Sequence, residues 1–253
     1  MTVTLGTFTP SVLLRVARRT GRLSQGVEEV AVASSPAQFA ALTDGTLDAG
    51  LTSPDNVLAH RGRHDVRVLA AIDRGMGLAL YSRVGAAGLP GARFGVDVPT
   101  SGFAFAMYAV LDSLGITDPA LVTLGSTPKR LRALLAGECD ATMLNAGNEL
   151  LAEQAGMTRV AGAPQPYLGT VLVSTSDHDR LAADLLATTA AILAGELDAE
   201  VLAEAGDALG LTGDTARLYL RRLTSPTEGL VAGGQVDQAA MATITELRRT
   251  YGR

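Results

Sequence analysis

The sequence has no tryptophan and a single cysteine, Cys139, in 253 residues. One cysteine cannot form an internal disulfide or a zinc site built from several thiolates. Aromatic residues make up only 4% of the chain, so we do not expect a large aromatic cage around a ligand. His-Glu-x-x-His and Cys-x-x-Cys motifs are also missing, and the sequence shows no cluster of carboxylates that would indicate a metal site. The sequence therefore predicts neither a metal site nor a cofactor.

Charged residues are scarce as well, at 19%, and acidic ones are in excess, with a formal net charge of −5. A nucleic-acid surface needs clustered lysine and arginine, so no nucleic-acid partner is expected. No run is long and apolar enough to cross a bilayer, so no membrane span is expected either. The chain enters a strand pattern at Val3 without a basic and apolar leader. This predicts a cytoplasmic protein as written, or an extracytoplasmic one if a leader has been removed.

What the sequence does contain is an internal repeat. Residues 34–58 and 126–150, offset by 92 positions, both begin with the pattern S-[ST]-P-x-x-[FL]-x-A-L-x-x-G-x-x-D-A. Asp48 in the first copy aligns with Asp140 in the second, and we expect both to tie a turn to its neighbours. Two copies are too few for a solenoid. They predict two lobes of similar build with a cleft between them.

Strand and helix patterns alternate in each copy. The second helix of each copy begins at a proline, Pro36 or Pro128, which suits the first turn of a helix. The resulting β-α-β-α-β order predicts a largely parallel sheet in each lobe. Two further strand patterns, at 76–81 and 169–173, are interpreted as crossings between the lobes. From residue 177 onward the pattern is helical, and we expect this tail to pack on the first lobe.

The predicted fold class is therefore α/β, with two α/β lobes joined by two hinge strands and a helical C-terminal tail. We assign residues 1–78 and 172–253 to lobe one with the C-terminal helices, and residues 79–171 to lobe two. Closure about the two hinge strands would trap a small ligand between the lobes.

The first copy of the repeat carries a family resemblance through Ser34, Gln38, Ala41, Leu42, Gly45, Asp48 and Ala49. These residues, and the segment GVDVPTSGFAFAMYAVLDSLGI in the second half, resemble the type 2 periplasmic-binding-protein fold. More narrowly, they resemble the nitrate, sulfonate, taurine and thiamine-precursor group of substrate-binding proteins. The resemblance implies a small-molecule ligand, and an ABC permease as a partner if the protein is exported. The Cys-rich iron motif of the pyrimidine-precursor synthases with this fold is absent.

Loops that follow the strands are the expected ligand site, because ligands of open α/β sheets bind beyond the carboxyl ends of the strands. These loops are rich in Ser, Thr, Asn and Gly, and most of them open a helix, where free N–H groups suit an anionic head group. The same residue types are good N-caps, and we expect Ser35 and Thr127 to act only as caps. The candidate ligand-binding residues are Phe8, Thr9, Ser11, Ser34, Ser53, Asn56, Thr100, Ser101, Gly102, Phe103, Asn145 and Tyr167.

Three functions remain open on this scaffold. The first is a substrate-binding protein that holds a small organic anion or heteroaromatic acid in the interlobe cleft. The second is a cytoplasmic enzyme without a cofactor, of the lyase, decarboxylase or cyclase type, because some relatives with this fold are cytoplasmic enzymes. Its catalytic acid and base would be Asp55 and Glu149, since a carboxyl in a dry cleft can hold a proton near neutral pH. The third is a cytoplasmic ligand sensor.

Overall fold

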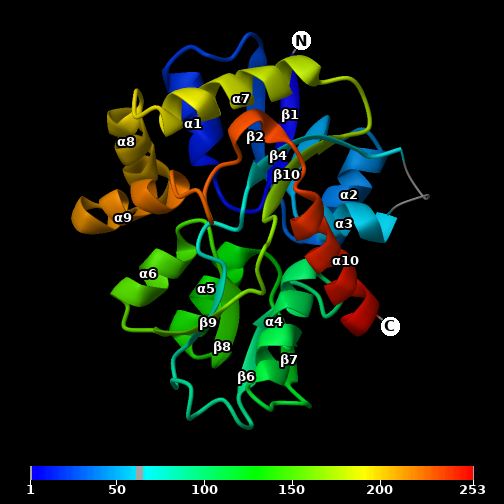
Figure 1. The fold of residues 1–253 in the computed structure, drawn as a ribbon, viewed down its shortest axis with the longest axis vertical. Helices are drawn as coiled ribbons and strands as arrows, with labels where there is room; N and C mark the ends of the chain where they lie inside the picture. Colours follow the sequence, from blue (N-terminus) through cyan, green and yellow to red (C-terminus); the bar gives the residue numbers. More distant parts are fainter. Residues whose placement is uncertain (1, 61–64, 253) are drawn as a thin grey trace.

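The computed structural model describes residues 2–60 and 65–252, which form two α/β lobes, one above the other in Figure 1. Each lobe contains one five-stranded sheet. The strands of lobe one are β1 (Thr2–Thr7), β2 (Gly26–Ala31), β3 (Ala49–Thr52), β4 (Arg67–Asp73) and β10 (Thr170–Ser174); those of lobe two are β5 (Ala79–Ser82), β6 (Arg93–Val96), β7 (Ala120–Thr123), β8 (Ala141–Leu144) and β9 (Thr158–Gly162).

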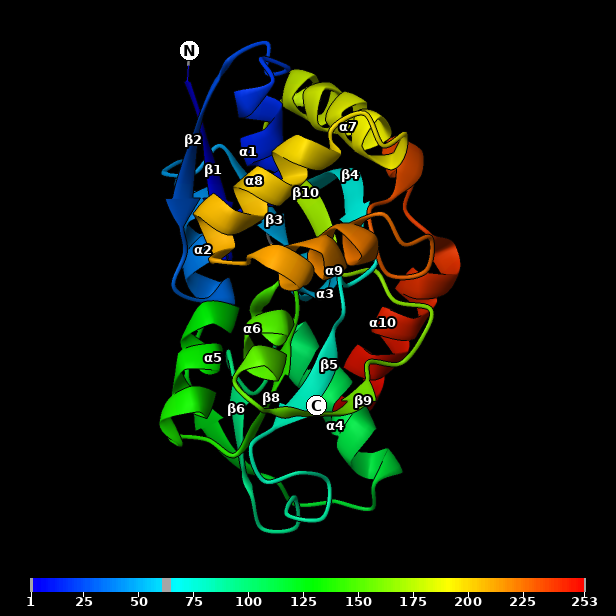
Figure 2. The same cartoon turned by 90° about the vertical axis from the view of Figure 1, so that its left-hand side faces the viewer.

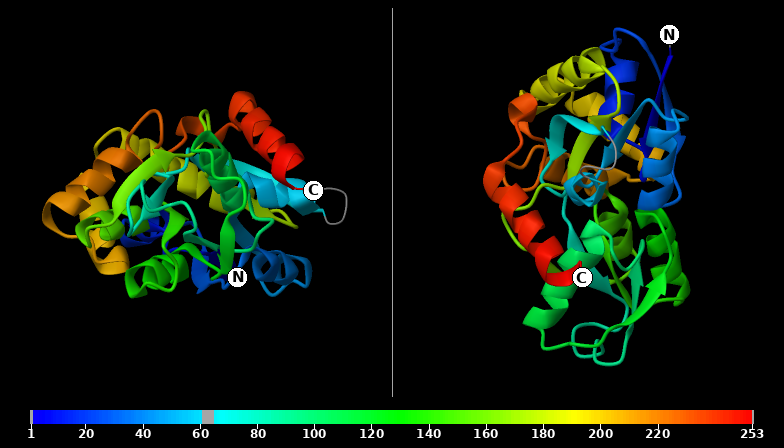
Figure 3. Two further views of the ribbon diagram at one scale, coloured as in Figure 1. Left: turned by 90° about the horizontal axis from the view of Figure 1, so that it is seen from below. Right: turned by 90° about the vertical axis from the view of Figure 1, so that its right-hand side faces the viewer.

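The helices follow the same division, with one exception. Lobe one carries α1 (Val12–Arg19), α2 (Ser35–Thr43), α3 (Pro54–His60), α7 (Asp179–Leu193), α8 (Asp198–Leu209), α9 (Gly213–Leu223) and the short 3-10 helix η1 (Ala232–Gly234). Lobe two carries α4 (Gly102–Ser113), α5 (Thr127–Ala136) and α6 (Asn148–Gln154). The exception is α10 (Gln238–Tyr251), which runs from lobe one down along lobe two (Figure 3).

The two sheets have matching topologies. Their strand orders are β2-β1-β3-β10-β4 and β7-β6-β8-β5-β9. The first three strands of each sheet are parallel, and the fourth, β10 or β5, is antiparallel to both of its neighbours. The predicted α/β class with two lobes is confirmed.

The repeated aspartates tie equivalent turns in the two lobes, as the repeat predicts. Oδ2 of Asp48 accepts the backbone N–H of Thr4 at 2.7 Å, and Oδ2 of Asp140 accepts the backbone N–H of Arg93 at 2.9 Å. Thr4 and Arg93 lie at equivalent places, because their next residues pair with Ala49 and Ala141 respectively. The repeat in the sequence is thus a repeat of one supersecondary unit.

The chain crosses between the lobes at residues 74–78 and again at 163–169. Strand β10 already pairs with lobe one at Thr170 and Val171, so the return strand begins two residues before the boundary assigned at 172. The two crossings are loops between strands, because β4 and β10 belong to the sheet of lobe one and β5 and β9 belong to the sheet of lobe two.

The C-terminal tail divides between the lobes, which corrects the expectation that it packs on lobe one alone. Helices α7 and α8 contact α1 of lobe one, but α10 contacts α4 of lobe two as well as α3. The cause is the apolar face of α10, where Ala240, Ile244 and Leu247 are buried in one cluster with Phe105 and Met107 of α4. No helix in residues 2–60 and 65–252 is long and apolar enough to cross a membrane.

Candidate functional site

A cavity of about 140 Å³ lies between the lobes, at the ends of the strands. It is walled by the loops that open α1, α3, α4 and α5, and by the loop after β8, so both lobes contribute. Ser11, Ser53, Gly102 and Asn145, which come from four different loops, all lie in its wall. The loops of the two repeats therefore converge on one cavity, as the repeat predicts for two matching halves.

Nine of the twelve candidate ligand-binding residues lie in the cavity wall, and their contact with a ligand stays a prediction. Of the other three, Ser34 caps α2 by accepting the N–H of Ala37 at 3.4 Å, and Thr100 is exposed. Tyr167 is buried in the core and borders a separate hollow near the crossings. The nine that line the cavity are Phe8, Thr9, Ser11, Ser53, Asn56, Ser101, Gly102, Phe103 and Asn145.

In lobe one, the N-terminus of α1 is occupied by a carboxylate of the protein itself. Oε1 of Glu29 accepts the backbone N–H of Ser11 at 2.6 Å and the hydroxyl of Thr7 at 3.1 Å. Its Oε2 pairs with Arg15 at 3.1 Å. Because this negative charge already sits at the positive end of the helix, α1 has little attraction left for a second anion.

In lobe two, the cavity wall contains a buried guanidinium, that of Arg130 in α5, with only 2% of its surface exposed. Its Nη1 donates to the carbonyl of Gly125 at 2.7 Å, and its Nη2 donates to Oγ1 of Thr127 at 3.0 Å and to the carbonyl of Met143 at 3.3 Å. Burial lowers the pKa of Arg130 to about 10, and the nearby Asp97 opposes that change. Arg130 thus supplies a positive charge to the cavity wall.

Asp97, which follows β6, lies in the same wall and meets lobe one across the cleft. Its Oδ2 accepts the backbone N–H of Ser35 at 3.1 Å and the hydroxyl of Ser35 at 2.5 Å. Its Oδ1 is buried and has no hydrogen-bond partner in the described part of the chain. Ser35 was expected to be only a helix cap, and this expectation is wrong because its side chain bonds the opposite lobe.

Further hydrogen bonds join the lobes around the cavity. Nδ2 of Asn148 in lobe two donates to Oγ1 of Thr9 in lobe one at 3.2 Å. The backbone N–H of Ser126 donates to the carbonyl of Ala33 at 3.2 Å. Together with the Ser35–Asp97 pair, these contacts describe a closed arrangement of the lobes.

The proposed catalytic carboxyls lie outside the cavity wall, in ion pairs with the C-terminal tail. Arg248 of α10 holds both oxygens of Asp55, at 2.7 and 2.8 Å. Arg222 of α9 donates to Glu149 at 2.7 Å, and the N–H of Gly147 donates to the other oxygen at 2.7 Å. Burial raises the pKa of Glu149 to about 7, against the opposing effect of Arg222. Both carboxyls therefore have structural partners.

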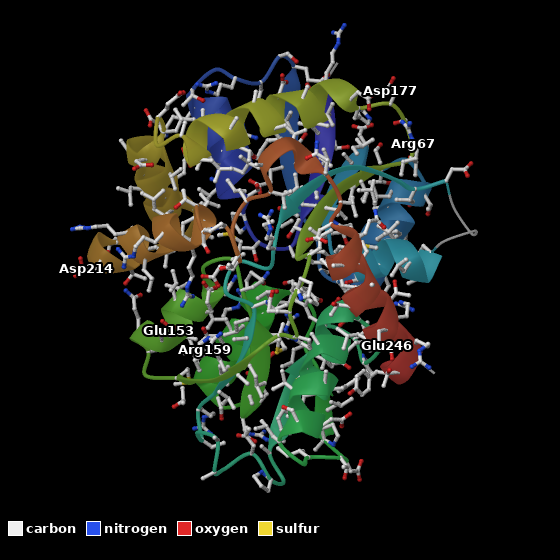
Figure 4. All side chains as sticks on the ribbon, in the orientation of Figure 1. Arg67, Glu153, Arg159, Asp177, Asp214 and Glu246 are labelled. Carbon is white, nitrogen blue, oxygen red and sulfur yellow. The ribbon has the colours of Figure 1, made fainter. Side chains whose placement is uncertain are left out.

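The ion pairs of Arg222 also connect the lobes on one flank. Besides Glu149, Arg222 pairs with Glu153 of α6 at 3.2 Å. Figure 4 labels Glu153 on α6, at the side of lobe two that lies below α9. The tail thus bonds lobe two through α9 as well as through α10.

Two residues of the cavity wall have a left-handed backbone without being glycine. They are Met76, in the first crossing, with φ of 48°, and Ala146, after β8, with φ of 53°. The N–H of Ala146 donates to the carbonyl of Met76 at 3.1 Å. Such conformations cost about 1–2 kcal/mol each for residues with a Cβ, and they concentrate at functional sites.

Sequence reasoning missed Arg130, Asp97 and Thr127 as wall residues. The signal for Arg130 was its spacing: with Thr127, Leu131 and Leu134 it falls on one helical face, the face that is buried. The signal for Asp97 was its position directly after the end of β6, where ligands of open α/β sheets bind.

Comparisons with known proteins bear on the fold. No protein-family model and no curated protein matches the sequence. Among solved structures, the alkanesulfonate-binding protein SsuA from Xanthomonas axonopodis bound to MOPS is similar, at 16% identity and a TM-score of 0.77, over 98% of this chain and 90% of that one.

Two further similar structures come from Staphylococcus aureus and Candida albicans. One is a ligand-binding component of an ABC-type import system from Staphylococcus aureus with zinc bound, at 12% identity and a TM-score of 0.77, over 100% of this chain and 92% of that one. The other is a Candida albicans protein with the periplasmic-binding-protein fold, at 15% identity and a TM-score of 0.73, over 100% and 90% of the chains. In the described residues, no group of three or more His, Cys, Asp or Glu could hold a metal ion. The similar structures show that this chain has the type 2 periplasmic-binding-protein fold, as the resemblance of its sequence implied.

Proposed function

We propose that the protein binds a small organic anion in the interlobe cavity and acts as the substrate-binding component of an ABC importer. The observation that carries this proposal is the buried Arg130 in the cavity wall, beside the N-termini of α4 and α5 of lobe two. A guanidinium and free N–H groups at helix starts are the chemistry that holds carboxylate or sulfonate head groups. The similar structure from Xanthomonas is an alkanesulfonate-binding protein, and the one from Staphylococcus is a ligand-binding component of an ABC-type import system. Both support the same function.

The size of the cavity limits the ligand. A protein cavity of about 150 Å³ is known to hold benzene, so a cavity of about 140 Å³ suits a ligand of roughly six to eight non-hydrogen atoms. Short-chain carboxylates and sulfonates fit this limit.

The partner would be an ABC permease, which places the protein outside the cytoplasm. The Staphylococcus structure, a component of an ABC-type import system, supports this partner, and the similar structures give no support to the expectation of a cytoplasmic protein. Catalysis is not proposed, because Asp55 and Glu149 are held in ion pairs away from the cavity wall.

The test is isothermal titration of the purified protein with a panel of carboxylates and sulfonates of up to about eight non-hydrogen atoms. We expect at least one to bind with a micromolar or tighter dissociation constant and to be recovered unchanged by mass spectrometry. Arg130→Gln should weaken this binding, whereas the matched control Lys129→Gln, which removes an exposed charge one residue before Arg130, should not. If no panel member binds, or if a bound compound is chemically altered, the proposal is wrong.

A further inference from the structure

The first crossing between the lobes, residues 74–78, has an unusual backbone. Gly75, Met76 and Gly77 have φ of 109°, 48° and 80°, so three residues in succession are left-handed. Glycine adopts this region without strain, but a residue with a Cβ stays there because the surrounding structure holds it. The contacts of Met76 and its neighbours therefore set the conformation of this crossing.

The backbone of Met76 is bonded to lobe one at its N–H and to lobe two at its carbonyl. Its N–H donates to the carbonyl of Glu228, in the tail segment after α9, at 2.8 Å. Its carbonyl accepts the N–H of Ala146, in the loop after β8, at 3.1 Å. The tail segment is fixed to lobe one, because the N–H of Val231 donates to the carbonyl of Ile72 in β4 at 2.8 Å. A rotation of the lobes at this crossing would therefore disturb bonds to both of them.

An ion pair between the lobes lies against the next residue, Gly77. Nη1 of Arg222 in α9 donates to Oε1 of Glu149 in α6 at 2.7 Å. A Cβ at Gly77 would lie 2.9 Å from that nitrogen and 3.1 Å from that oxygen, so the pair fills the space beside the crossing. The side chain of Glu149 is 1% exposed and that of Arg222 is 14% exposed. We call Arg222, Glu149 and Gly77 the hinge lock.

The energetics of a buried ion pair give Arg222 control over closure. Because α9 belongs to lobe one and α6 to lobe two, separation of the lobes would break the pair and let water bond both charges. A buried pair adds little net stability, but removing one partner leaves the other charge buried and unpaired, which is strongly unfavourable. Glu149 can therefore be buried in the closed arrangement because Arg222 is there to pair with it.

Helix α9 also lines the ligand cavity. Tyr219 and Leu223 lie in the cavity wall, on either side of Arg222 along this helix, and Met76 of the crossing lies in the same wall. A ligand that contacts these residues would therefore touch the same elements that carry the hinge lock.

We infer that the hinge lock regulates closure over the cavity, with Arg222 of the tail holding the first crossing at the angle of the closed arrangement. This inference rests on the proposed function, because the cavity that closes is the proposed ligand site. Arg222 is a positioning residue, since it lies outside the cavity wall and acts through the crossing. Weakening the lock shifts the lobes toward the open arrangement, and ligand affinity falls with the closed fraction.

Amide hydrogen exchange, measured by NMR without added ligand, tests the lock directly. The N–H groups of Ser35 and Ser126 donate across the lobes, so their exchange rates report how often the lobes part. The N–H groups of Asp48 and Asp140 donate within lobe one and lobe two, and they are the internal references. We expect Arg222→Gln to raise exchange at Ser35 and Ser126 about a hundredfold, with the references within about threefold.

Two controls separate the ion pair from general effects of substitution. Arg221→Gln removes an exposed arginine of the same helix and should change exchange by less than about twofold. Arg222→Gln combined with Glu149→Gln removes both charges, so no charge stays buried without a partner. We expect this double variant to exchange about tenfold more slowly at Ser35 and Ser126 than Arg222→Gln alone, which a simple loss of packing would not produce.

A pair of glycine variants tests the lock from the crossing, and it decides the matter if Arg222→Gln does not fold. Gly77→Ala places a Cβ against the ion pair, whereas a Cβ at Gly91, which has a similar φ of 77°, meets no described atom within 4 Å beyond its chain neighbours. Both variants carry the strain of a left-handed alanine. We expect Gly77→Ala, but not Gly91→Ala, to accelerate exchange at Ser35 and Ser126 relative to the references.

Calorimetric titration then connects the lock to ligand binding. For a panel anion that binds the wild type, Arg222→Gln should weaken binding about tenfold or more, and Arg221→Gln should not. Unchanged exchange at Ser35 and Ser126 in the folded variants overturns the inference, and so does unchanged affinity in Arg222→Gln. Failure of every panel compound to bind overturns the proposed function, whereas the exchange rates, which need no ligand, still decide whether Arg222 controls closure.

Discussion

The two lobes share one framework and differ in what they present to the cavity. In lobe one, Nε2 of Gln38 donates to the carbonyl of Leu51 at 3.1 Å. In lobe two, 92 positions later, Nη2 of Arg130 donates to the carbonyl of Met143 at 3.3 Å, and Met143 is the repeat partner of Leu51. The same buried place thus holds a neutral amide in one lobe and a cation in the other, and only the cation lies in the cavity wall.

The loops that follow the strands also differ in charge and polarity between the two lobes. Glu29, which fills the N-terminus of α1, matches Leu121 in lobe two, which is exposed. Phe8, one residue beyond β1, matches Asp97, one residue beyond β6. At these positions lobe one therefore offers an apolar side chain and a neutralised helix end, whereas lobe two offers Arg130 and Asp97. In a duplicated scaffold, the positions at which the two copies differ in sequence are the ones that can distinguish the two ends of an asymmetric ligand.

The largest expected effect comes from making lobe two resemble lobe one. Arg130→Gln places in α5 the residue that α2 has at the same position. We expect the affinity for the panel anion that binds best to fall about a hundredfold, or about 3 kcal/mol, because the variant removes the buried cation of the wall. Calorimetric titration measures the change.

The control for that comparison is Lys129→Gln, which should alter affinity by less than about twofold because its side chain is exposed. An Arg130→Gln variant that folds and binds as tightly as the wild type would remove the distinction between the lobes.

A second effect concerns the ion pair by which lobe one's tail bonds lobe two. The pKa of Glu149 is raised to about 7 by burial, above the value of about 4.3 in an unfolded chain. The folded state therefore binds this proton more tightly, and the free energy of unfolding should decrease as the pH rises from about 4.5 through 7. Glu149→Gln should remove this contribution, on the order of 1–3 kcal/mol, from urea unfolding measured at each pH.

The matched control is Glu153→Gln, which changes a half-buried carboxyl of the same helix. The difference in unfolding free energy between wild type and Glu149→Gln should decrease with rising pH. Parallel pH profiles for all three proteins would contradict the assignment.

A third pair of variants compares the equivalent turns directly. Asp140 accepts the side chain of Arg93 as well as its backbone N–H, and these bonds lower the pKa of Asp140 to about 2. Its contribution to stability is present above about pH 3.9, the unfolded value, and is lost as the pH falls toward 2. Because Arg93 and Asp140 are partly exposed to solvent, we expect Asp140→Asn to cost only about 1 kcal/mol at neutral pH.

Asp48→Asn is the control, since among residues 2–60 and 65–252 the carboxylate of Asp48 accepts only from Thr4. We expect its cost to be somewhat smaller, and acid unfolding monitored by circular dichroism should begin at a higher pH for Asp140→Asn than for the wild type. The same acid midpoint in wild type and Asp140→Asn would show that the arginine contacts add nothing.

The smallest effect belongs to the loop after β8. Ala146 has φ of 53°, and its repeat partner in lobe one is Pro54. Ala146→Gly removes the Cβ that this conformation disfavours, so we expect the protein to gain about 0.5 kcal/mol of stability. Ala187→Gly, on an exposed helical position of α7, should instead cost about 1 kcal/mol. Thermal unfolding compares the two, and a loss in both would mean that Ala146 is not strained.

Much of the framework could be predicted because local patterns determine it. The Asp48 and Asp140 turns, the two sheets and nine cavity residues follow from a repeat and from the rule that ligands bind beyond strand ends. Each of these depends on residues within one repeat. Ser35 illustrates the limit, because a Ser-Pro helix start predicts a cap, and only the docking of the lobes brings it to Asp97.

The parts that could not be predicted involve residues far apart in the chain. Asp55 pairs with Arg248 across 193 positions, and Glu149 pairs with Arg222 across 73. No sequence periodicity indicates such pairs. A carboxylate next to a predicted cleft is therefore interpreted as catalytic until the structure shows the arginine that pairs with it. The packing of α10 on α4 has the same origin, because its apolar face does not specify which lobe it covers.

Helix α10 limits how the two halves can move apart. It is bonded to lobe one through Arg248 and Asp55, its Arg248 lies over the ring of Phe105 in lobe two, and its Tyr251 bonds Asp112 of α4. Figure 2 shows α10 on one side of the molecule and α2 above α5 on the other. Because α10 joins the two lobes on one side, we expect the interlobe cleft to open on the opposite side. A ligand would then enter between α2 and α5, beside the Ser35–Asp97 contact.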